Sequence, residues 1–205
     1  RAQEARNDWL RREAERLRPK AIPLVHNETS TGAPYPAAEV GKIARSVGAL
    51  FMLDTVSSIA GLDVRTDEWG VDLNMTGSQK CLAAPLGMAI VSVGAAGWEA
   101  MERRKHKATS WAYDLLRWKE NWIPASRGGH VPDGSPRRQP VSIPTHLTQA
   151  LGAASRLILE EGLEHRFRRH AVAGRAFRAG LDAMRLQMFA DASLLSNTVS
   201  CFRTP

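Results

Sequence analysis

The chain has 205 residues, 43% of them hydrophobic and 24% charged, so it can bury a sizeable core and is too apolar to be disordered. Its two cysteines, Cys81 and Cys201, are too few for a disulfide framework, and this low cysteine content predicts a reducing compartment, the cytoplasm. No apolar run is long enough to cross a membrane. The net charge is +7, but aromatic side chains do not interleave with the basic residues, so we expect neither a nucleic-acid nor a membrane partner.

The N-terminal half alternates short apolar segments with amphipathic ones. The expected elements are, in chain order, a helix over 1–18, a strand over 21–25, a polar loop over 26–32, a helix from Pro36 to Val47 ended by Gly48, strands over 50–53, 71–75 and 88–93, and a helix over 97–104. Uninterrupted apolar strands are typical of a parallel sheet that is buried on both faces. The sequence therefore predicts an α/β fold in which helices flank a mainly parallel sheet.

The C-terminal half begins with residues 108–145, which are rich in Trp, Pro and Gly and predict a long irregular loop of the kind found at functional sites or interfaces. Helices are expected over about 145–161 and 163–184, with Gly162 between them, followed by strands near 186–189 and 198–202. The arginines of the second helix are assigned to a solvated face; they are Arg166, Arg168, Arg169, Arg175 and Arg178.

Two domains follow from this organisation. We expect residues 1–145 to form a large domain, and residues 146–205 to hold linking helices and the start of a smaller C-terminal α/β domain. The chain begins with Arg1 rather than Met and stops within an expected strand, so we expect it to be a fragment.

Polar clusters follow three of the expected strands, at residues 26–32, 54–58 and 76–80. In open α/β sheets, ligands bind in the crevice beyond the carboxyl ends of the strands. Each cluster alone could be an ordinary loop, but three in succession predict one shared binding site at this edge of the sheet.

Lys80 and Asp54 are the two most informative residues of these clusters. Lys80 lies in a tight Gly-Ser-Gln-Lys loop, where a lysine amine can lose its proton and form a Schiff base with an aldehyde. Asp54 ends an apolar strand, where a carboxylate is costly without a cationic partner, and a protonated pyridine nitrogen would be such a partner. Thr29, Ser78 and Ser142 could offer hydroxyls to a phosphate or phenolate oxygen.

The segments 25–32, 53–61, 76–87 and 158–170 resemble class V pyridoxal-phosphate aminotransferases, and within that class the serine–glyoxylate and alanine–glyoxylate enzymes. The resemblance implies the large domain of a fold-type I enzyme and a homodimer whose sites are completed across the interface. It also implies transfer of an amino group from a small amino acid, of the serine or alanine type, to glyoxylate or pyruvate. (S)-Ureidoglycine–glyoxylate and pyridoxamine–pyruvate transamination stay open as alternatives.

The resemblance also implies roles for single residues. Lys80 would bind pyridoxal phosphate covalently and move the substrate proton, Asp54 would pair with the pyridine nitrogen, and Val56 would pack against a ring face. The other cofactor contacts would be Thr29 near the phenolic oxygen, Ser78 and Gln79 at the phosphate, and Ser142 at the phosphate of the partner subunit.

Parts of the family pattern are absent from this chain. Gln139 stands where the family usually has an aromatic residue, three positions before Ser142. The glycine-rich phosphate loop, the ring-stacking aromatic and the carboxylate-binding arginine would lie outside the 205 residues, so we expect little turnover from this chain alone.

Other chemistries lack their residues. No Pro-Cys-x-x-Cys follows His26 and Glu28, so we expect no zinc site or other metal, and Gln79 stands where cysteine desulfurases have a histidine. A non-catalytic α/β module that binds anionic partners through its basic surface is the alternative from a different functional class.

Overall fold

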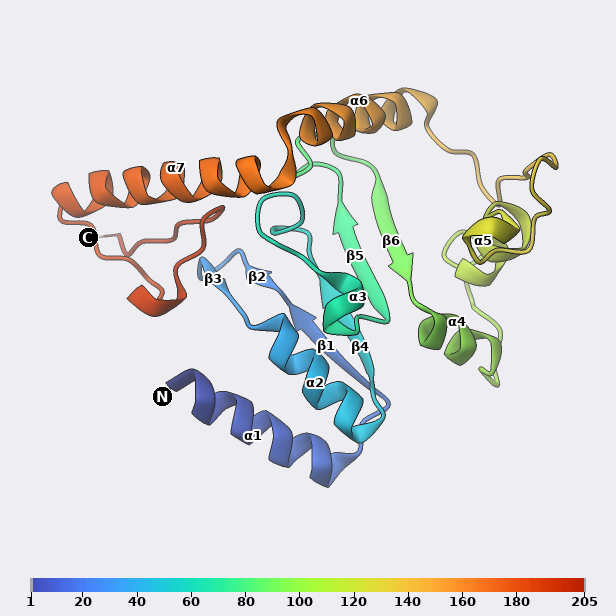
Figure 1. The fold of residues 1–205 in the computed structure, drawn as a ribbon, viewed down its shortest axis with the longest axis horizontal. Coiled ribbons are helices and arrows are strands. Elements are labelled where there is room, and N and C mark those ends of the chain that lie inside the picture. Colours follow the sequence, from blue (N-terminus) through green and yellow to red (C-terminus); the bar gives the residue numbers. More distant parts are fainter. Residues whose placement is uncertain (1, 205) are drawn as a thin grey trace.

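The centre of the fold is a four-stranded sheet with the order β1-β4-β5-β6, described here for residues 2–204 from a computed structural model (Figure 1). The strands are β1 (Ala21–Val25), β4 (Leu50–Asp54), β5 (Leu73–Gly77) and β6 (Ala89–Val93). The first three run parallel, and β6 is antiparallel to β5. The expected α/β fold with a mainly parallel sheet is therefore confirmed.

One side of the sheet is covered by two helices, α1 (Ala2–Leu17) and α2 (Ala37–Val47) (Figure 1). Residue 1, which was also expected in the first helix, lies outside the described residues, as does residue 205. The hydrophobic core lies between α2 and the sheet and consists of Ala14, Ile22, Ala37, Val40, Ile43, Ala44, Ala49, Phe51 and Leu53. The spacing of apolar residues in α2 predicted this buried face.

The helix α2 ends as expected at Gly48, whose φ of 72° lies in the left-handed region that glycine adopts without strain. Helix α2 also packs closely against α3 (Thr66–Trp69). A Cβ atom at Gly41 would lie 1.9 Å from the backbone oxygen of Trp69, so only glycine lets these two helices approach this closely.

Two sheet elements differ from expectation. Strand β5 starts at Leu73 rather than residue 71, because Asp72 accepts the backbone N–H of Phe51 through Oδ2 at 2.8 Å while Val71 closes the turn onto Thr66. The polar loop 26–32 contains part of a small antiparallel hairpin, β2 (Asn27–Glu28) and β3 (Ala33–Pro34).

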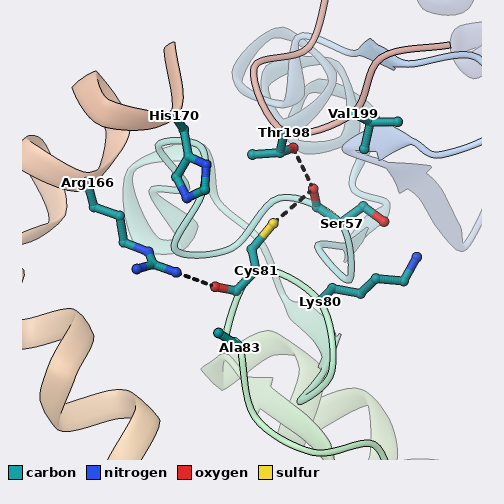
Figure 2. Close-up of a pocket in the computed structure, with 8 residues that line it drawn as sticks. All are labelled: Ser57, Lys80, Cys81, Ala83, Arg166, His170, Thr198 and Val199. Atoms are coloured by element: carbon teal, nitrogen blue, oxygen red, sulfur yellow. Dashed lines mark hydrogen bonds between the residues drawn. The ribbon is translucent and has the colours of Figure 1, made fainter. Parts of the chain in front are cut away.

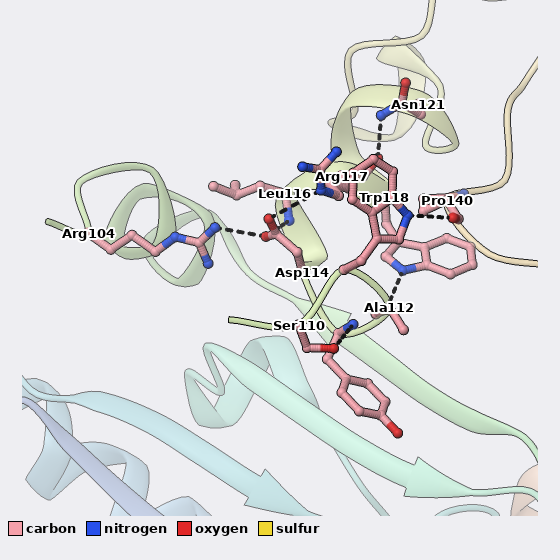
Figure 3. Close-up of polar contacts among 11 residues, drawn as sticks. Arg104, Ser110, Ala112, Asp114, Leu116, Arg117, Trp118, Asn121 and Pro140 are labelled. Atoms are coloured by element: carbon pink, nitrogen blue, oxygen red, sulfur yellow. Dashed lines mark hydrogen bonds and ion pairs between the residues drawn. The ribbon is translucent and has the colours of Figure 1, made fainter. Parts of the chain in front are cut away.

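The region 108–145 is not wholly irregular, because it contains α5 (Leu115–Asn121) and a 3-10 turn, η1 (Ala125–Arg127). Figure 3 shows the polar contacts that stabilise α5. Asp114 accepts the N–H of Leu116 and forms an ion pair with Arg104 at 2.8 Å. The Trp118 indole donates to the backbone carbonyl of Ala112. Sequence patterns missed this helix because a seven-residue helix is too short to show periodicity.

Three further helical segments follow the sheet. Helix α4 (Ala95–Glu102) starts two residues before the expected position, because the N–H of Trp98 bonds to the carbonyl of Gly94 and begins the helix there. The helices α6 (Thr145–Glu161) and α7 (Leu163–Ala183) form as predicted, separated by Gly162. Among the described residues, no helix is long and apolar enough to cross a membrane.

The two strands expected near 186–189 and 198–202 do not form. A single bridge joins Met188 and Phe202, and the turn η2 (Ala192–Leu194) lies between them. Two backbone bonds flank this bridge, from Phe189 to the carbonyl of Cys201 at 2.9 Å and from Arg203 to that of Gln187 at 2.8 Å, and the pairing extends no further. Between the two segments, the N–H of Ser196 donates to the carbonyl of Gly32 at 2.9 Å. The C-terminal segment is thus tied to the loops of the sheet.

Substituting Leu53 tests this core. Leu53→Ala should lower the free energy of unfolding by about 2–5 kcal/mol, because the side chain is 0% exposed and its loss leaves a cavity. Denaturant unfolding measures this, with Leu159→Ala on α6 as the control, since Leu159 is 71% exposed. Equal losses in both variants would contradict the assigned core.

Candidate functional site

Three loops meet at the carboxyl edge of the parallel strands. The register aligns Val25 of β1 with Asp54 of β4, and Asp54 with Met75 of β5. Backbone bonds extend this alignment beyond the strands, since His26 donates to the carbonyl of Asp54 and Thr55 donates to that of Met75, both at 2.9 Å. The three expected polar clusters therefore lie side by side, as the sequence predicted.

Lys80 is exposed on the loop after β5. This loop closes on itself, because Ala83 donates to the carbonyl of Lys80 and Ala84 donates to that of Ser78. Figure 2 shows the Lys80 side chain extending away from Arg166 and His170. No side chain within residues 2–204 forms a hydrogen bond or ion pair with its amine.

Asp54 is half-buried at the end of β4. Its Oδ1 atom accepts the backbone N–H of Val56 at 2.8 Å. Within the described part of the chain, no lysine, arginine or histidine lies within ion-pair distance of the carboxylate. A half-buried carboxylate has lost part of its hydration and gains from a cationic partner, so this position suits a cationic ligand group.

Thr29 belongs to a polar network that sequence reasoning missed. Its hydroxyl lies 2.7 Å from that of Ser57, and the carbonyl of Ser57 accepts from both Asn27 at 2.7 Å and Thr198 at 3.0 Å. Ser57 was part of the cluster after Asp54. Thr198 gave no sequence signal, because it lies 141 residues away along the chain from Ser57.

The remaining expected cofactor residues lie in different settings. The Ser78 hydroxyl is fully buried, where it donates to the carbonyl of Pro85 at 2.6 Å and accepts the N–H of Met88 at 3.2 Å. Gln79 is exposed and its amide lies over Gly77, where a Cβ atom would be 2.7 Å from Oε1. Ser142 is exposed, and no contact in the described part of the chain joins it to the other residues.

A cavity of about 310 Å³ lies beside Lys80 and is lined by Ser57, Lys80, Cys81, Ala83, Arg166, His170, Thr198 and Val199 (Figure 2). Burial raises the pKa of the Cys81 thiol, so this cysteine is protonated at neutral pH. Burial also lowers the pKa of His170, helped by the charges of Arg169 and Arg166. The cavity is therefore bounded by a neutral thiol and a neutral imidazole.

Arg166 corrects one expectation, because it is only 9% exposed and does not lie on a solvated face. Its guanidinium bonds to backbone carbonyls of the two loops that follow β4 and β5. Helix periodicity could not show this, since the acceptors come from a distant part of the chain. Arg168 and Arg175 are exposed, as expected.

The residues at the strand ends fit pyridoxal phosphate. An amine without a protein partner matches an aldehyde, a carboxylate without a cation matches a protonated ring nitrogen, and exposed hydroxyl and amide groups match phosphate and phenolic oxygens. These are Lys80, Asp54, Thr29 and Gln79. By contrast, no group of three or more metal-binding side chains occurs in the described residues.

The family model described as aminotransferase class V matches residues 11–118, just over half of the chain. The chain belongs to the class V aminotransferase family. An uncharacterized aminotransferase of Methanocaldococcus jannaschii is 39% identical over 91% of this chain and 45% of that protein. Serine–glyoxylate aminotransferase of Arabidopsis thaliana is 36% identical over 91% of this chain and 44% of that protein. The chain spans about half the length of the curated relatives it matches.

Solved structures agree with this family. Ureidoglycine–glyoxylate aminotransferase from Bacillus subtilis superimposes with a TM-score of 0.86 at 34% identity, covering 97% of this chain and 49% of that one. The shared fold is the fold-type I architecture of pyridoxal-phosphate aminotransferases, which confirms the expected fold class.

Substituting Ser78 separates a structural role from a cofactor contact in this class V chain. Ser78→Ala should lower the free energy of unfolding by about 0.5–1.5 kcal/mol, because the N–H of Met88 and the carbonyl of Pro85 lose their hydrogen-bond partner. Ser142→Ala, at an exposed position, is the control and should change stability little. A Ser78→Ala protein of unchanged stability would show that these two bonds do not hold the loop.

His26 should make stability depend on pH. Burial lowers the pKa of its imidazole below the usual 6.5, against a smaller opposing effect of Asp63, while Nδ1 lies 2.9 Å from the Ser58 hydroxyl. Near pH 6.5 the His26 imidazole therefore binds a proton in the unfolded chain but not in the folded chain. Protonation thus favours unfolding, so the free energy of unfolding should fall as the pH drops below about 7.

Denaturant titrations between pH 8 and 5 measure this slope. His26→Gln should flatten it, and His170→Gln should flatten the remainder, because the pKa of His170 is also lowered by burial. A slope in His26→Gln equal to that of the parent would refute the assignment to His26.

Proposed function

We propose that the protein containing this chain is a pyridoxal-phosphate-dependent aminotransferase. It moves an amino group from a small amino acid, of the serine or alanine type, to glyoxylate or pyruvate. The observation that carries this proposal is the pair Lys80 and Asp54: Asp54 ends β4, Lys80 lies in the loop after the adjacent parallel strand β5, and neither has a charged partner within residues 2–204. When bound, pyridoxal phosphate supplies an electron sink for the substrate carbanion.

Lys80 and Asp54 have distinct chemical tasks in this proposal. The Lys80 amine would anchor the cofactor covalently and would serve as the base for the substrate Cα proton. The Asp54 carboxylate pairs with the ring nitrogen and keeps it protonated, so that the ring can take up electrons. The N–H of Val56 orients that carboxylate through Oδ1.

The other residues bind and orient the cofactor. Val56 would pack against one ring face, the Thr29 hydroxyl would approach the phenolic oxygen, and Gln79 and Ser78 would lie at the phosphate. Support for Thr29 is its 2.7 Å contact with the Ser57 hydroxyl, which fixes the direction of its oxygen. Ser78 contributes through the shape of its loop, since both bonds of its hydroxyl are to backbone groups.

The proposal also covers the oligomeric state and the cellular location of the protein. We infer a cytoplasmic homodimer in which Ser142, exposed and away from the other site residues, reaches the phosphate of the partner subunit. Residues 1–145 belong to the cofactor-binding domain, and residues 146–205 hold the linking helices and the start of the small domain. Relatives named for glyoxylate support that acceptor, and (S)-ureidoglycine or pyridoxamine are the alternative donors.

Covalent trapping of the cofactor tests the proposal. The parent protein, expressed from the longest reading frame that contains this chain, should develop a visible absorbance band with pyridoxal phosphate, which borohydride fixes onto Lys80. Lys80→Ala should fix none, whereas Lys105→Ala, an exposed lysine outside the site, should match the parent. Peptide mapping locates the modified lysine.

Asp54→Asn provides the second arm of the test. This variant should keep the covalent attachment but lose about 100-fold or more in turnover, because the ring nitrogen would lose the carboxylate that keeps it protonated, a change of about 3 kcal/mol. Fixation on Lys80→Ala as efficient as on the parent would refute the lysine assignment. Salt-sensitive binding of polyanions without cofactor uptake would instead favour the non-catalytic module.

A further inference from the structure

Arg166 connects the C-terminal helices to the candidate site. It lies in the first turn of α7 and is 9% exposed, whereas its neighbours Arg168 and Arg169 are exposed. A guanidinium keeps its charge even when buried, so its burial requires good hydrogen-bond partners. Those partners show what it does.

The guanidinium bonds to two loops at once. Its Nε donates to the carbonyl of Ala60 at 2.9 Å, and its Nη2 donates to the carbonyl of Cys81 at 2.9 Å, the second bond being visible in Figure 2. Ala60 belongs to the loop that follows Asp54, and Cys81 is the residue after Lys80. One rigid planar group therefore joins the loop of the carboxylate to the loop of the amine.

Glu161 forms an ion pair with the remaining nitrogen of the guanidinium, Nη1. Its Oε2 atom lies 2.8 Å from Nη1 of Arg166, and it also pairs with Arg169. Hydrogen bonds from Arg169 and Arg166 lower the pKa of Glu161 to about 2, so it stays ionised at neutral pH. The carboxylate at the end of α6 thus balances the charge of Arg166.

The backbone at Ala60 has the strain expected of a held conformation. Its φ of 63° lies in the left-handed region, which alanine rarely adopts, and the residue is 7% exposed. Such a conformation persists only where the surroundings determine it. Here the carbonyl of Ser58 accepts from Gly61 and Leu62, and Arg166 takes the carbonyl of Ala60.

We propose that Arg166 is a positioning residue that sets the location of Lys80 relative to Asp54. This inference rests on the proposed function, because a rigid cofactor ring must reach the amine at one end and the carboxylate at the other. Arg166 acts through the two backbone carbonyls and touches neither functional side chain. Without it, the loops would move independently and the two groups would be less often at the required separation.

The test compares Arg166→Lys with two matched variants. Arg166→Lys keeps the charge near Glu161 but cannot span both carbonyls, so it should slow borohydride-fixable attachment of pyridoxal phosphate at Lys80 by about tenfold. Arg168→Gln, at an exposed position on the same helix, should react like the parent. Glu161→Gln should lower the melting temperature while leaving the attachment rate within about twofold, since both carbonyl bonds persist.

Amide hydrogen exchange on the cofactor-free protein gives a readout that does not depend on the chemistry. Exchange should accelerate in residues 58–62 and 79–84 together in Arg166→Lys, and in neither segment in Arg168→Gln. Unchanged exchange in both segments, or an attachment rate equal to that of the parent, would overturn the role of Arg166. An equal slowing in Glu161→Gln would also overturn it, because general destabilisation would then explain the effect.

Two outcomes separate this inference from the proposed function. If the parent fixes no cofactor at Lys80 but the two loops loosen together in Arg166→Lys, the aminotransferase proposal fails while the mechanical link stands. If Arg166→Lys does not fold, amide hydrogen exchange in the parent protein tests the link instead. The two loops and the first turn of α7 should then open in one step with the same denaturant dependence, and separate opening would refute the link.

Discussion

The parallel pairing of β1, β4 and β5 is the constraint on which the site depends. Parallel strands place their carboxyl ends at one edge, and the register of Val25, Asp54 and Met75 aligns those ends residue by residue. A shift of one residue would turn Asp54 to the other face of the sheet and bury its carboxylate among apolar side chains. The packing of α2 on Phe51 and Leu53 fixes this register, so the core and the site are not independent.

Polar side chains around the site divide into two groups. The buried ones hold the backbone: Thr55 donates to Asn74, Asn27 donates to Ser57, and Ser78 bridges the turn after β5. Asp54 and Lys80, in contrast, have no charged partner in residues 2–204. An amine and a partly buried carboxylate that are left without a charged partner are free to receive a ligand.

Sequence reasoning succeeded where structure is local. The strand over 21–25, the helix of α2 and the helices α6 and α7 follow from periodicity and from Gly48 and Gly162. It failed where distant residues decide the outcome, as at Asp72, which delays β5, and at Arg166, whose acceptors are two loops of the sheet. The positions of Lys80 and Asp54 were predictable because Asp54 ends its strand and Lys80 lies in the short loop after the next one, whereas their separation depends on those distant contacts.

The bond from Thr198 to the carbonyl of Ser57 closes a loop of 141 residues. Closing so long a loop costs chain entropy before any contact compensates for it. Because a chain emerges from the ribosome starting at its N-terminus, the sheet and both reactive loops are synthesised well before Thr198. Before the C-terminal segment arrives, the amide of Asn27 can already donate to the carbonyl of Ser57, but both groups still lack their contact with the Thr198 hydroxyl. The sheet can therefore form early in synthesis, while the site reaches its final shape only after Thr198 has been synthesised.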